Sequence, residues 1–143
     1  MAIEQFSHSL PMVLYRALDA VMPRFRKIFN EFGLTEQQWR VLRVLWDQEA
    51  VTLNRLAAQT LIPAPSLVGI VDRLERDELV TRQRSEADRR KVNVVLTSQG
   101  AALEDDIMPR VASEYAELKR SVDPDTWDRV LDGLNAIAAA GRA

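Results

Sequence analysis

The sequence predicts a mainly helical fold that contains a single β-hairpin. Three observations support this prediction. Apolar residues recur at spacings of three and four over most of the 143-residue chain, glycine is scarce, and the apolar period changes to two only between residues 79 and 96. With 47% apolar and 28% charged residues, the chain can bury a substantial core, and its length fits one domain.

The first predicted helix covers residues 9–32. Ser9 can cap its start, and Pro11 is tolerated in its first turn. Pro23 is expected to bend the helix, and Gly33 to end it.

Three short helices should follow. Thr35 and Gln38 form the capping-box pattern of a second helix that runs to about Asp47. Thr52 is expected to cap a third helix over residues 53–60. Two prolines then delay the fourth helix, which we expect over residues 66–77.

The hairpin comes next, with strands expected at residues 79–84 and 92–96. A long helix then opens near Thr97 and Gly100 and is expected to kink at Pro109. Asp123 and the proline after it are typical of the N-cap and first position of a last helix.

Three compact helices followed by a hairpin form the outline of a winged helix-turn-helix. In that fold the third short helix can lie in the major groove of DNA, and the hairpin, or wing, can reach the adjacent minor groove or the backbone. The net charge of the chain is −2, yet residues 82–91 hold five cations and two anions. Such a locally basic segment on an acidic body is typical of a nucleic-acid contact.

The start of the fourth helix and the wing tip supply the candidate DNA-binding residues. The helix start is small and apolar, which suits thymine methyl groups and a phosphate at the helix N-terminus. Arg73 can reach a phosphate or a base edge, although a pair with Asp77 is the alternative. The full set is Arg55, Ala64, Pro65, Ser66, Leu67, Arg73, Asp88, Arg89, Arg90 and Lys91.

At the wing tip, Asp88 lies among three cations. We expect it to orient one arginine through a charge-assisted hydrogen bond, so that the guanidinium can enter the minor groove. The alternative is a solvated turn without a function.

Three motifs resemble the MarR (multiple-antibiotic-resistance-regulator) family: VDRLERDELV at 71–80, DRR at 88–90 and VVLTSQG at 94–100. The resemblance implies one MarR-type domain over residues 1–143. In it, residues 1–34 and 98–143 form intertwined dimerisation helices, and residues 35–97 form the DNA-binding lobe. The family usually has glycine where this chain has Glu78, so the end of the fourth helix is in question.

The stretches LTEQQWR at 34–40 and PSLVGI at 65–70 are similar to the subgroup that regulates homoprotocatechuate and related aromatic-acid degradation. The resemblance implies a repressor whose operator affinity is lowered by an aromatic acid. Such an acid needs an apolar slot and a cation for its carboxylate. The candidate ligand-binding residues are Ser9, Arg16, Trp39, Arg40 and Arg43, with His8 as a further polar partner.

Simpler interpretations exist for these arginines. Glu36–Arg40 and Arg43–Asp47 have the i,i+4 spacing of surface ion pairs, and Asp19 lies three residues after Arg16.

The first and last helices carry more apolar surface than a small lobe can cover. We therefore expect a homodimer on a pseudo-palindromic operator. The alternative is that these helices only cover their own lobe.

Composition excludes other classes of protein. With no cysteine and one histidine, disulfides, cysteine nucleophiles and Cys/His zinc sites are excluded, and we expect no cofactor and no metal. The three acidic residues at 104–106 are interpreted as the solvent-exposed start of a helix and not as catalytic groups, so we expect no enzymatic activity. No apolar run could span a membrane, and we expect a cytosolic protein. A winged-helix protein-interaction module that does not bind DNA is the remaining alternative.

Overall fold

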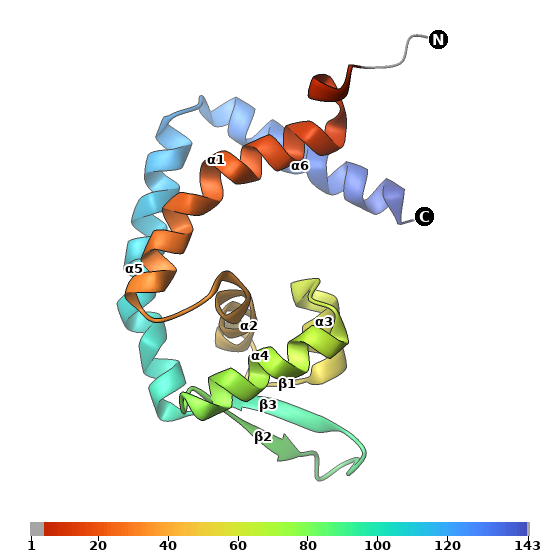
Figure 1. The fold of residues 1–143 in the computed structure, drawn as a ribbon, viewed down its shortest axis with the longest axis vertical. Coiled ribbons are helices and arrows are strands. Elements are labelled where there is room, and N and C mark those ends of the chain that lie inside the picture. The colour runs from red at the N-terminus through yellow and green to blue at the C-terminus, as the bar shows by residue number, and fades with distance from the viewer. Residues whose placement is uncertain (1–4, 143) are drawn as a thin grey trace. The chain divides into compact units, whose positions relative to one another are not determined.

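The computed structural model describes residues 5–142 and has the mainly helical fold with a small β-sheet that the sequence predicts (Figure 1). Residues 1–4 and 143, the ends of the expected domain, lie outside the described part. The elements are η1 Phe6–His8, α1 Leu10–Glu31, α2 Glu36–Asp47, β1 Ala50–Thr52, α3 Leu53–Thr60, α4 Ala64–Arg76, β2 Val80–Arg84, β3 Val92–Leu96, α5 Ser98–Arg120 and α6 Pro124–Gly141. Contacts divide the chain into two compact units, residues 1–108 and 109–143.

Helix α1 begins at the predicted place, but the expected side-chain cap is not made. The Ser9 hydroxyl donates to the Phe6 carbonyl oxygen at 2.8 Å, because a 3-10 turn precedes the helix. The helix continues through Pro23. It ends as predicted at Gly33, which has a φ of 72°, and the Leu34 N–H donates to the Phe29 carbonyl at 2.9 Å.

The capping predictions for α2 and α3 are confirmed. Thr35 Oγ1 accepts from the Gln38 N–H at 3.1 Å, and Gln38 Oε1 accepts from the Thr35 N–H at 2.9 Å. Thr52 Oγ1 accepts from the Arg55 N–H at 3.3 Å. Local sequence therefore sets where these two helices begin.

Helix α4 begins at Ala64, two residues before the predicted start. Proline is tolerated in a first helical turn because the N–H it lacks would have no partner within the helix. At the other end Glu78 takes a φ of 63°, so the chain turns as it would with glycine. The Leu79 N–H donates to the Leu74 carbonyl at 2.9 Å, and the Thr97 hydroxyl donates to the Glu78 carbonyl at 2.6 Å.

The sheet contains one strand that the sequence did not predict. Strand β1 pairs antiparallel with β3, which also pairs with β2, so the order is β1-β3-β2. The side chains of Val51 and Val94 lie opposite each other and are buried. Strand β1 is three residues long, too short to show a period of two.

Helices α2, α3 and α4 and the sheet enclose the core of the lobe. Its fully buried side chains include Val41, Leu42, Leu45, Val51, Leu56, Leu67, Val71, Leu74, Val80 and Val94. Gly100 fixes the start of α5 against this core, because a Cβ there would lie 2.0 Å from the Leu79 carbonyl oxygen. The Trp46 indole N–H donates to the Gly100 carbonyl at 3.0 Å.

The C-terminal unit contains the end of α5 and all of α6. As predicted, Asp123 caps α6: its Oδ1 accepts from the Thr126 N–H at 2.9 Å. Hydrogen bonds from the Thr126 hydroxyl and N–H lower the pKa of Asp123. The Lys119 ammonium lies 5.5 Å from the centre of the Trp127 ring.

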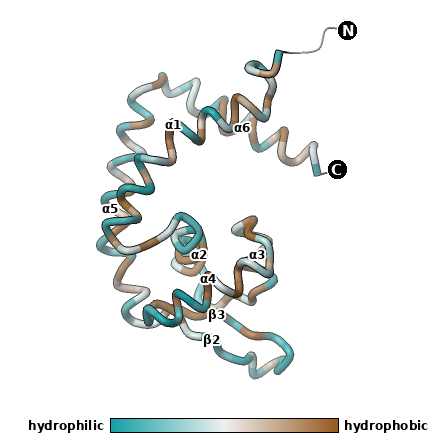
Figure 2. Tube along the Cα trace, viewed as in Figure 1, coloured by the Kyte–Doolittle hydropathy of each residue, from teal (hydrophilic) through white to brown (hydrophobic). Residues whose placement is uncertain are grey.

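The terminal helices expose apolar side chains. No residue of α6 is buried, although the helix carries Val130, Leu131 and Ile137. The first half of α1 likewise exposes Leu10, Val13, Tyr15 and Leu18. Apolar segments therefore recur along both helices (Figure 2). None of the helices in residues 5–142 has the length and hydropathy of a membrane span.

Candidate nucleic-acid interface and ligand pocket

Helix α4 presents one face to the core and the other to solvent. The exposed face includes Ala64, Pro65, Ser66 and Arg73, four of the predicted DNA-binding residues. Leu67 is only 1% exposed, so the prediction that its side chain contacts DNA is wrong. Its position follows from the helical period, because it lies on the same face as the buried Leu74.

The predicted arginines of the lobe helices are available for contacts. Arg73 and Arg55 are exposed. The pair between Arg73 and Asp77 that the spacing allowed is absent; only the Asp77 backbone N–H bonds there, to the Arg73 carbonyl at 3.0 Å. Among the residues described, no ion pair includes the guanidinium of either arginine.

The wing tip is an ordered turn between β2 and β3. The Ser85 N–H donates to the Lys91 carbonyl at 2.9 Å, and the Lys91 N–H donates to the Asp88 carbonyl at 3.0 Å. The Arg84 guanidinium reaches across the turn and donates to the Arg89 carbonyl at 2.6 Å. The tip therefore has a defined backbone, and it is coloured as hydrophilic in Figure 2.

Asp88 holds one arginine, as predicted, and that arginine is Arg90. Asp88 Oδ1 accepts from the Arg90 backbone N–H at 3.0 Å and from its Nε at 3.2 Å. These two hydrogen bonds, with the charge of Lys91, hold the pKa of Asp88 below its ordinary value. The Arg90 side chain is 92% exposed, so the guanidinium is oriented while it projects into solvent.

Arg82 has a role that the sequence did not reveal. Its guanidinium turns back to α4, where it donates to Asp72 Oδ1 at 2.7 Å and to Glu75 Oε1 at 2.9 Å. Its backbone N–H also donates to Glu75 Oε2 at 3.1 Å, and Nη2 donates to the Val68 carbonyl at 3.3 Å. We call this group of Arg82, Asp72 and Glu75 the wing brace. It removes Arg82 from the cations at the wing tip and joins β2 to α4.

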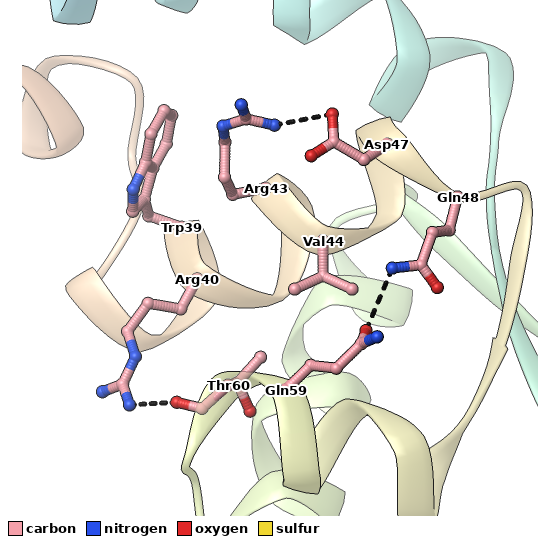
Figure 3. A pocket seen from close by; sticks show the side chains of 8 residues that line it. All are labelled: Trp39, Arg40, Arg43, Val44, Asp47, Gln48, Gln59 and Thr60. Carbon is pink, nitrogen blue, oxygen red and sulfur yellow. Dashed lines mark hydrogen bonds and ion pairs between the residues drawn. The ribbon is translucent and has the colours of Figure 1, made fainter. Parts of the chain in front are cut away.

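A pocket of about 300 Å³ opens between α2 and α3 (Figure 3). It is lined by Trp39, Arg40, Arg43, Val44, Asp47, Gln48, Gln59 and Thr60. The Arg40 guanidinium reaches the Thr60 carbonyl, and Arg43 pairs with Asp47 at 2.9 Å (Figure 3). The Trp39 ring stacks on Phe29, with 4.7 Å between ring centres.

The structure brings three of the five predicted ligand-binding residues to this pocket. Trp39, Arg40 and Arg43 line it, whereas Ser9 and Arg16 do not. Arg16 Nη2 donates to the Ser7 carbonyl at 2.6 Å. His8 Nδ1 lies 3.2 Å from the Ser7 hydroxyl.

The two simpler interpretations of the α2 arginines have different outcomes. The Arg43–Asp47 pair is confirmed. The prediction of a Glu36–Arg40 pair is wrong. Glu36 pairs with Arg26 of α1 at 3.3 Å, and the Arg40 guanidinium donates to the Thr60 carbonyl of α3. No group of three or more potential metal ligands occurs in the described part of the chain.

Comparison with known proteins points to one family. The model of the MarR family matches residues 34–92. The "Homoprotocatechuate degradative operon repressor" of Escherichia coli is 33% identical over 94% of this chain and 91% of its own.

Two solved structures are similar over nearly the whole chain. One is NadR in complex with 4-hydroxyphenylacetate, with 33% identity, 96% of this chain and 98% of that chain covered, and a TM-score of 0.80. The other is the transcriptional repressor CouR bound to a 23-mer DNA duplex, with 28% identity, 96% and 99% covered, and a TM-score of 0.85.

Proposed function

Because the chain belongs to the MarR family of DNA-binding transcriptional regulators, we propose that it is a homodimeric repressor whose operator is released when an aromatic acid binds. The observation that carries the DNA-binding part is the wing tip, where an ordered turn and Asp88 hold Arg90 in solvent. An arginine that is already oriented loses less conformational entropy when it enters a narrow groove of negative potential.

We propose that one part of the chain binds DNA and that another forms the dimer interface. Residues 35–97 form the DNA-binding lobe, and residues 1–34 and 98–143 supply the dimerisation helices. The exposed apolar side chains of α1 and α6 support this division, because a second copy would remove them from water. A two-fold dimer would present two lobes to half-sites about 34 Å apart, so the operator is pseudo-palindromic.

Within each lobe, we assign two groups of DNA contacts. The exposed face of α4, with Ala64, Pro65, Ser66 and Arg73, enters the major groove. The wing cations Arg89, Arg90 and Lys91 contact the minor groove or the phosphates, and Arg55 of α3 contacts a phosphate.

The test of DNA binding begins with selection of duplexes from a random library, followed by fluorescence anisotropy at several salt concentrations. Specific binding with a steep loss of affinity in salt is expected. Asp88→Asn should weaken binding about fivefold, because the neutral amide oxygen can still accept from Arg90 but holds it less firmly than the carboxylate does.

Glu86→Gln is the matched control, since it removes an exposed anion of the same tip without a bond to Arg90. It should leave affinity unchanged or raise it. If Asp88→Asn behaves like Glu86→Gln, Asp88 does not position the wing arginine. If the wild-type protein selects no duplex, the proposed function itself fails.

For the effector, we propose a hydroxylated phenylacetate or benzoate in the pocket between α2 and α3. Arg43 can exchange the Asp47 carboxylate for that of the ligand, and Trp39 supplies an aromatic wall. The names of the similar proteins support this chemistry: one represses a homoprotocatechuate degradative operon, and another was solved with 4-hydroxyphenylacetate.

A thermal-shift titration tests this proposal, because a ligand that binds only the native protein raises its melting temperature. We expect 4-hydroxyphenylacetate to raise it and the uncharged 4-hydroxyphenylacetamide to have little effect. Arg43→Gln should remove the difference between the two compounds. Equal shifts from acid and amide in the wild-type protein would refute the carboxylate site and leave the DNA-binding proposal intact.

A further inference from the structure

The two arginines that line the pocket between α2 and α3 have different partners. Arg43 pairs with the Asp47 carboxylate at 2.9 Å. The guanidinium of Arg40 donates to the Thr60 carbonyl, and within residues 5–142 it has no carboxylate partner (Figure 3). A carbonyl oxygen is a weaker acceptor for a guanidinium than an ionised carboxylate. Arg40 is therefore the arginine of the pocket that an entering anion can bind without displacing a carboxylate.

The carbonyl that Arg40 contacts belongs to the last residue of α3. The last carbonyls of a helix have no partner within the helix and form the negative end of its dipole, so a cation stabilises them. Thr60 is buried, and its hydroxyl also contacts both sides of the helix end. It donates to the Leu56 carbonyl at 2.5 Å and accepts from the Ile62 N–H at 3.4 Å. Arg40 thus holds the point where α3 ends and the turn to α4 begins.

The turn between α3 and α4 has an unfavourable backbone conformation. Leu61, which follows Thr60, has a φ of 57° and a ψ of 29°, a left-handed conformation that is costly for a residue with a Cβ. Its side chain is 69% exposed, so burial offsets little of that cost. Helix α4 begins at Ala64, directly after this turn. A contact at Thr60 therefore acts on the start of the helix that we assign to the major groove.

We propose that Arg40 is a positioning residue for α4, and that the effector releases the operator by drawing Arg40 away from Thr60. Arg40 and Arg43 lie three residues apart on α2, so the two oxygens of one carboxylate can reach both guanidinium groups. The charged carboxylate competes successfully with the Thr60 carbonyl for Arg40.

The consequence for DNA binding follows from the turn. Once the Thr60 carbonyl loses its donor, the turn no longer holds α4 in the position that fits the major groove. The effector then binds more tightly to the state that has the lower operator affinity, as coupling between two sites requires. This inference rests on the proposed function and deepens it, because it names the residue that links the effector pocket to the DNA-binding helix.

Arg40→Gln tests the inference, because glutamine lacks the charge and the length of arginine. The variant without ligand should bind the duplex selected by the wild-type protein about tenfold more weakly than the wild type does, a typical coupling between two sites. Saturating 4-hydroxyphenylacetate should weaken wild-type binding by about the same factor, and it should weaken binding by Arg40→Gln less than about twofold. Fluorescence anisotropy measures all four affinities. A merely structural role of Arg40 would lower affinity but leave the response to the ligand intact.

Binding of the ligand itself is measured separately, by thermal shift. Arg40→Gln keeps Arg43 and Trp39 in the pocket, so saturating 4-hydroxyphenylacetate should still raise its melting temperature. The variant is thus expected to bind the ligand without a change in operator affinity.

Gln59→Ala is the matched control at the same pocket. Gln48 Nε2 donates to Gln59 Oε1 at 3.1 Å, so this hydrogen bond also joins the end of α2 to α3 (Figure 3). It involves no charged group, and Gln59→Ala should keep the response of about tenfold to the ligand. Arg40→Lys keeps a cation that can donate to either acceptor, so it should respond to the ligand more than Arg40→Gln does.

Three outcomes would overturn the inference while the proposed function stands. The first is an Arg40→Gln protein whose operator affinity still falls about tenfold with the ligand. The second is a Gln59→Ala protein as unresponsive as Arg40→Gln, which would attribute the coupling to any contact between α2 and α3. The third is an Arg40→Gln protein that no ligand concentration stabilises, which would make Arg40 a ligand-binding residue only. A wild-type protein that selects no duplex, or that the ligand does not stabilise, would instead contradict the proposed function.

Discussion

The lobe of residues 35–97 and the terminal helices have the same kind of apolar pattern, but its apolar side chains are buried in the lobe and exposed in the terminal helices. In the lobe, Leu42, Leu45 and Leu56 are fully buried within one chain. In α6, Val130, Leu131 and Ile137 remain 51%, 47% and 48% exposed. The contrast teaches that a helical period identifies an apolar face and does not identify what covers it.

The largest expected effect comes from a charge on the exposed apolar face of α6. Leu131→Glu should abolish dimerisation, because a second copy would have to bury an unpaired carboxylate. Each lobe would then bind its half-site alone, and operator affinity should fall about a hundredfold or more. Analytical ultracentrifugation and anisotropy measure the two effects.

Arg129→Glu introduces the same side chain at an exposed polar position of α6. It should leave both the dimer and operator affinity nearly unchanged. A Leu131→Glu protein that sediments as the wild type does would show that this face is not the dimer interface.

The next largest effect is expected at the wing brace. This group lies in the lobe, whose core is buried within one chain. Arg82→Ala removes the guanidinium hydrogen bonds to Asp72 and Glu75 and should cost about 1–2 kcal/mol in the free energy of unfolding. Operator affinity should also fall about tenfold, since the backbone N–H bond to Glu75 alone then holds β2 to α4 at this position. Urea denaturation and anisotropy report the two losses.

Arg82→Lys keeps the charge but lacks the fork that reaches two carboxylates, so it should recover only part of each loss. Full recovery with lysine would mean that charge, and not the geometry of the brace, holds the wing.

A smaller effect of opposite sign is expected at the end of α4. Glu78→Gly should stabilise the lobe by about 1 kcal/mol, since a residue with a Cβ is strained at a φ of 63°. Glu78→Ala, which keeps the strain and removes the charge, should give no comparable gain. Thermal unfolding distinguishes the two variants, and equal gains would attribute the effect to charge.

The smallest effect is a titration at the wing tip. Asp88 should titrate below its ordinary pKa of 3.8, because its carboxylate accepts hydrogen bonds from Arg90. The stabilising interaction of the Asp88 carboxylate with Arg90 is therefore fully present above about pH 4, and it is lost only as the pH falls through the lowered pKa of Asp88. Carbon-detected NMR of the Asp88 carboxyl group measures the midpoint, which Arg90→Ala should raise towards 3.8.

Features that depend on neighbouring residues could be predicted from the sequence. The Thr35–Gln38 capping box, the Thr52 and Asp123 caps and the turn at Gly33 are formed within three or four residues, so the sequence displays them directly. The contact of Asp88 with Arg90 spans two residues and was predictable for the same reason.

Features that depend on distant partners could not be predicted. Val51 of β1 pairs with Val94, 43 positions later, and the partners of Arg82 lie on the preceding helix. The i,i+4 spacing predicts a pair of Arg40 with Glu36 on its own helix, whereas the fold supplies the Thr60 carbonyl from α3. The error at Leu67 has a local cause instead: the apolar helix start suggests a DNA contact, but the helical period, which the sequence itself displays, directs this side chain inward.

The tryptophans also give this protein its own optical probe. Trp39 lines the pocket, and its ring centre lies 5.5 Å from that of Trp46 in an edge-to-face arrangement. Trp127 instead lies beneath the Lys119 ammonium. In a Trp127→Phe protein, tryptophan fluorescence would come from the two indoles of α2, so quenching by an added aromatic compound could be assigned to that helix without any attached dye.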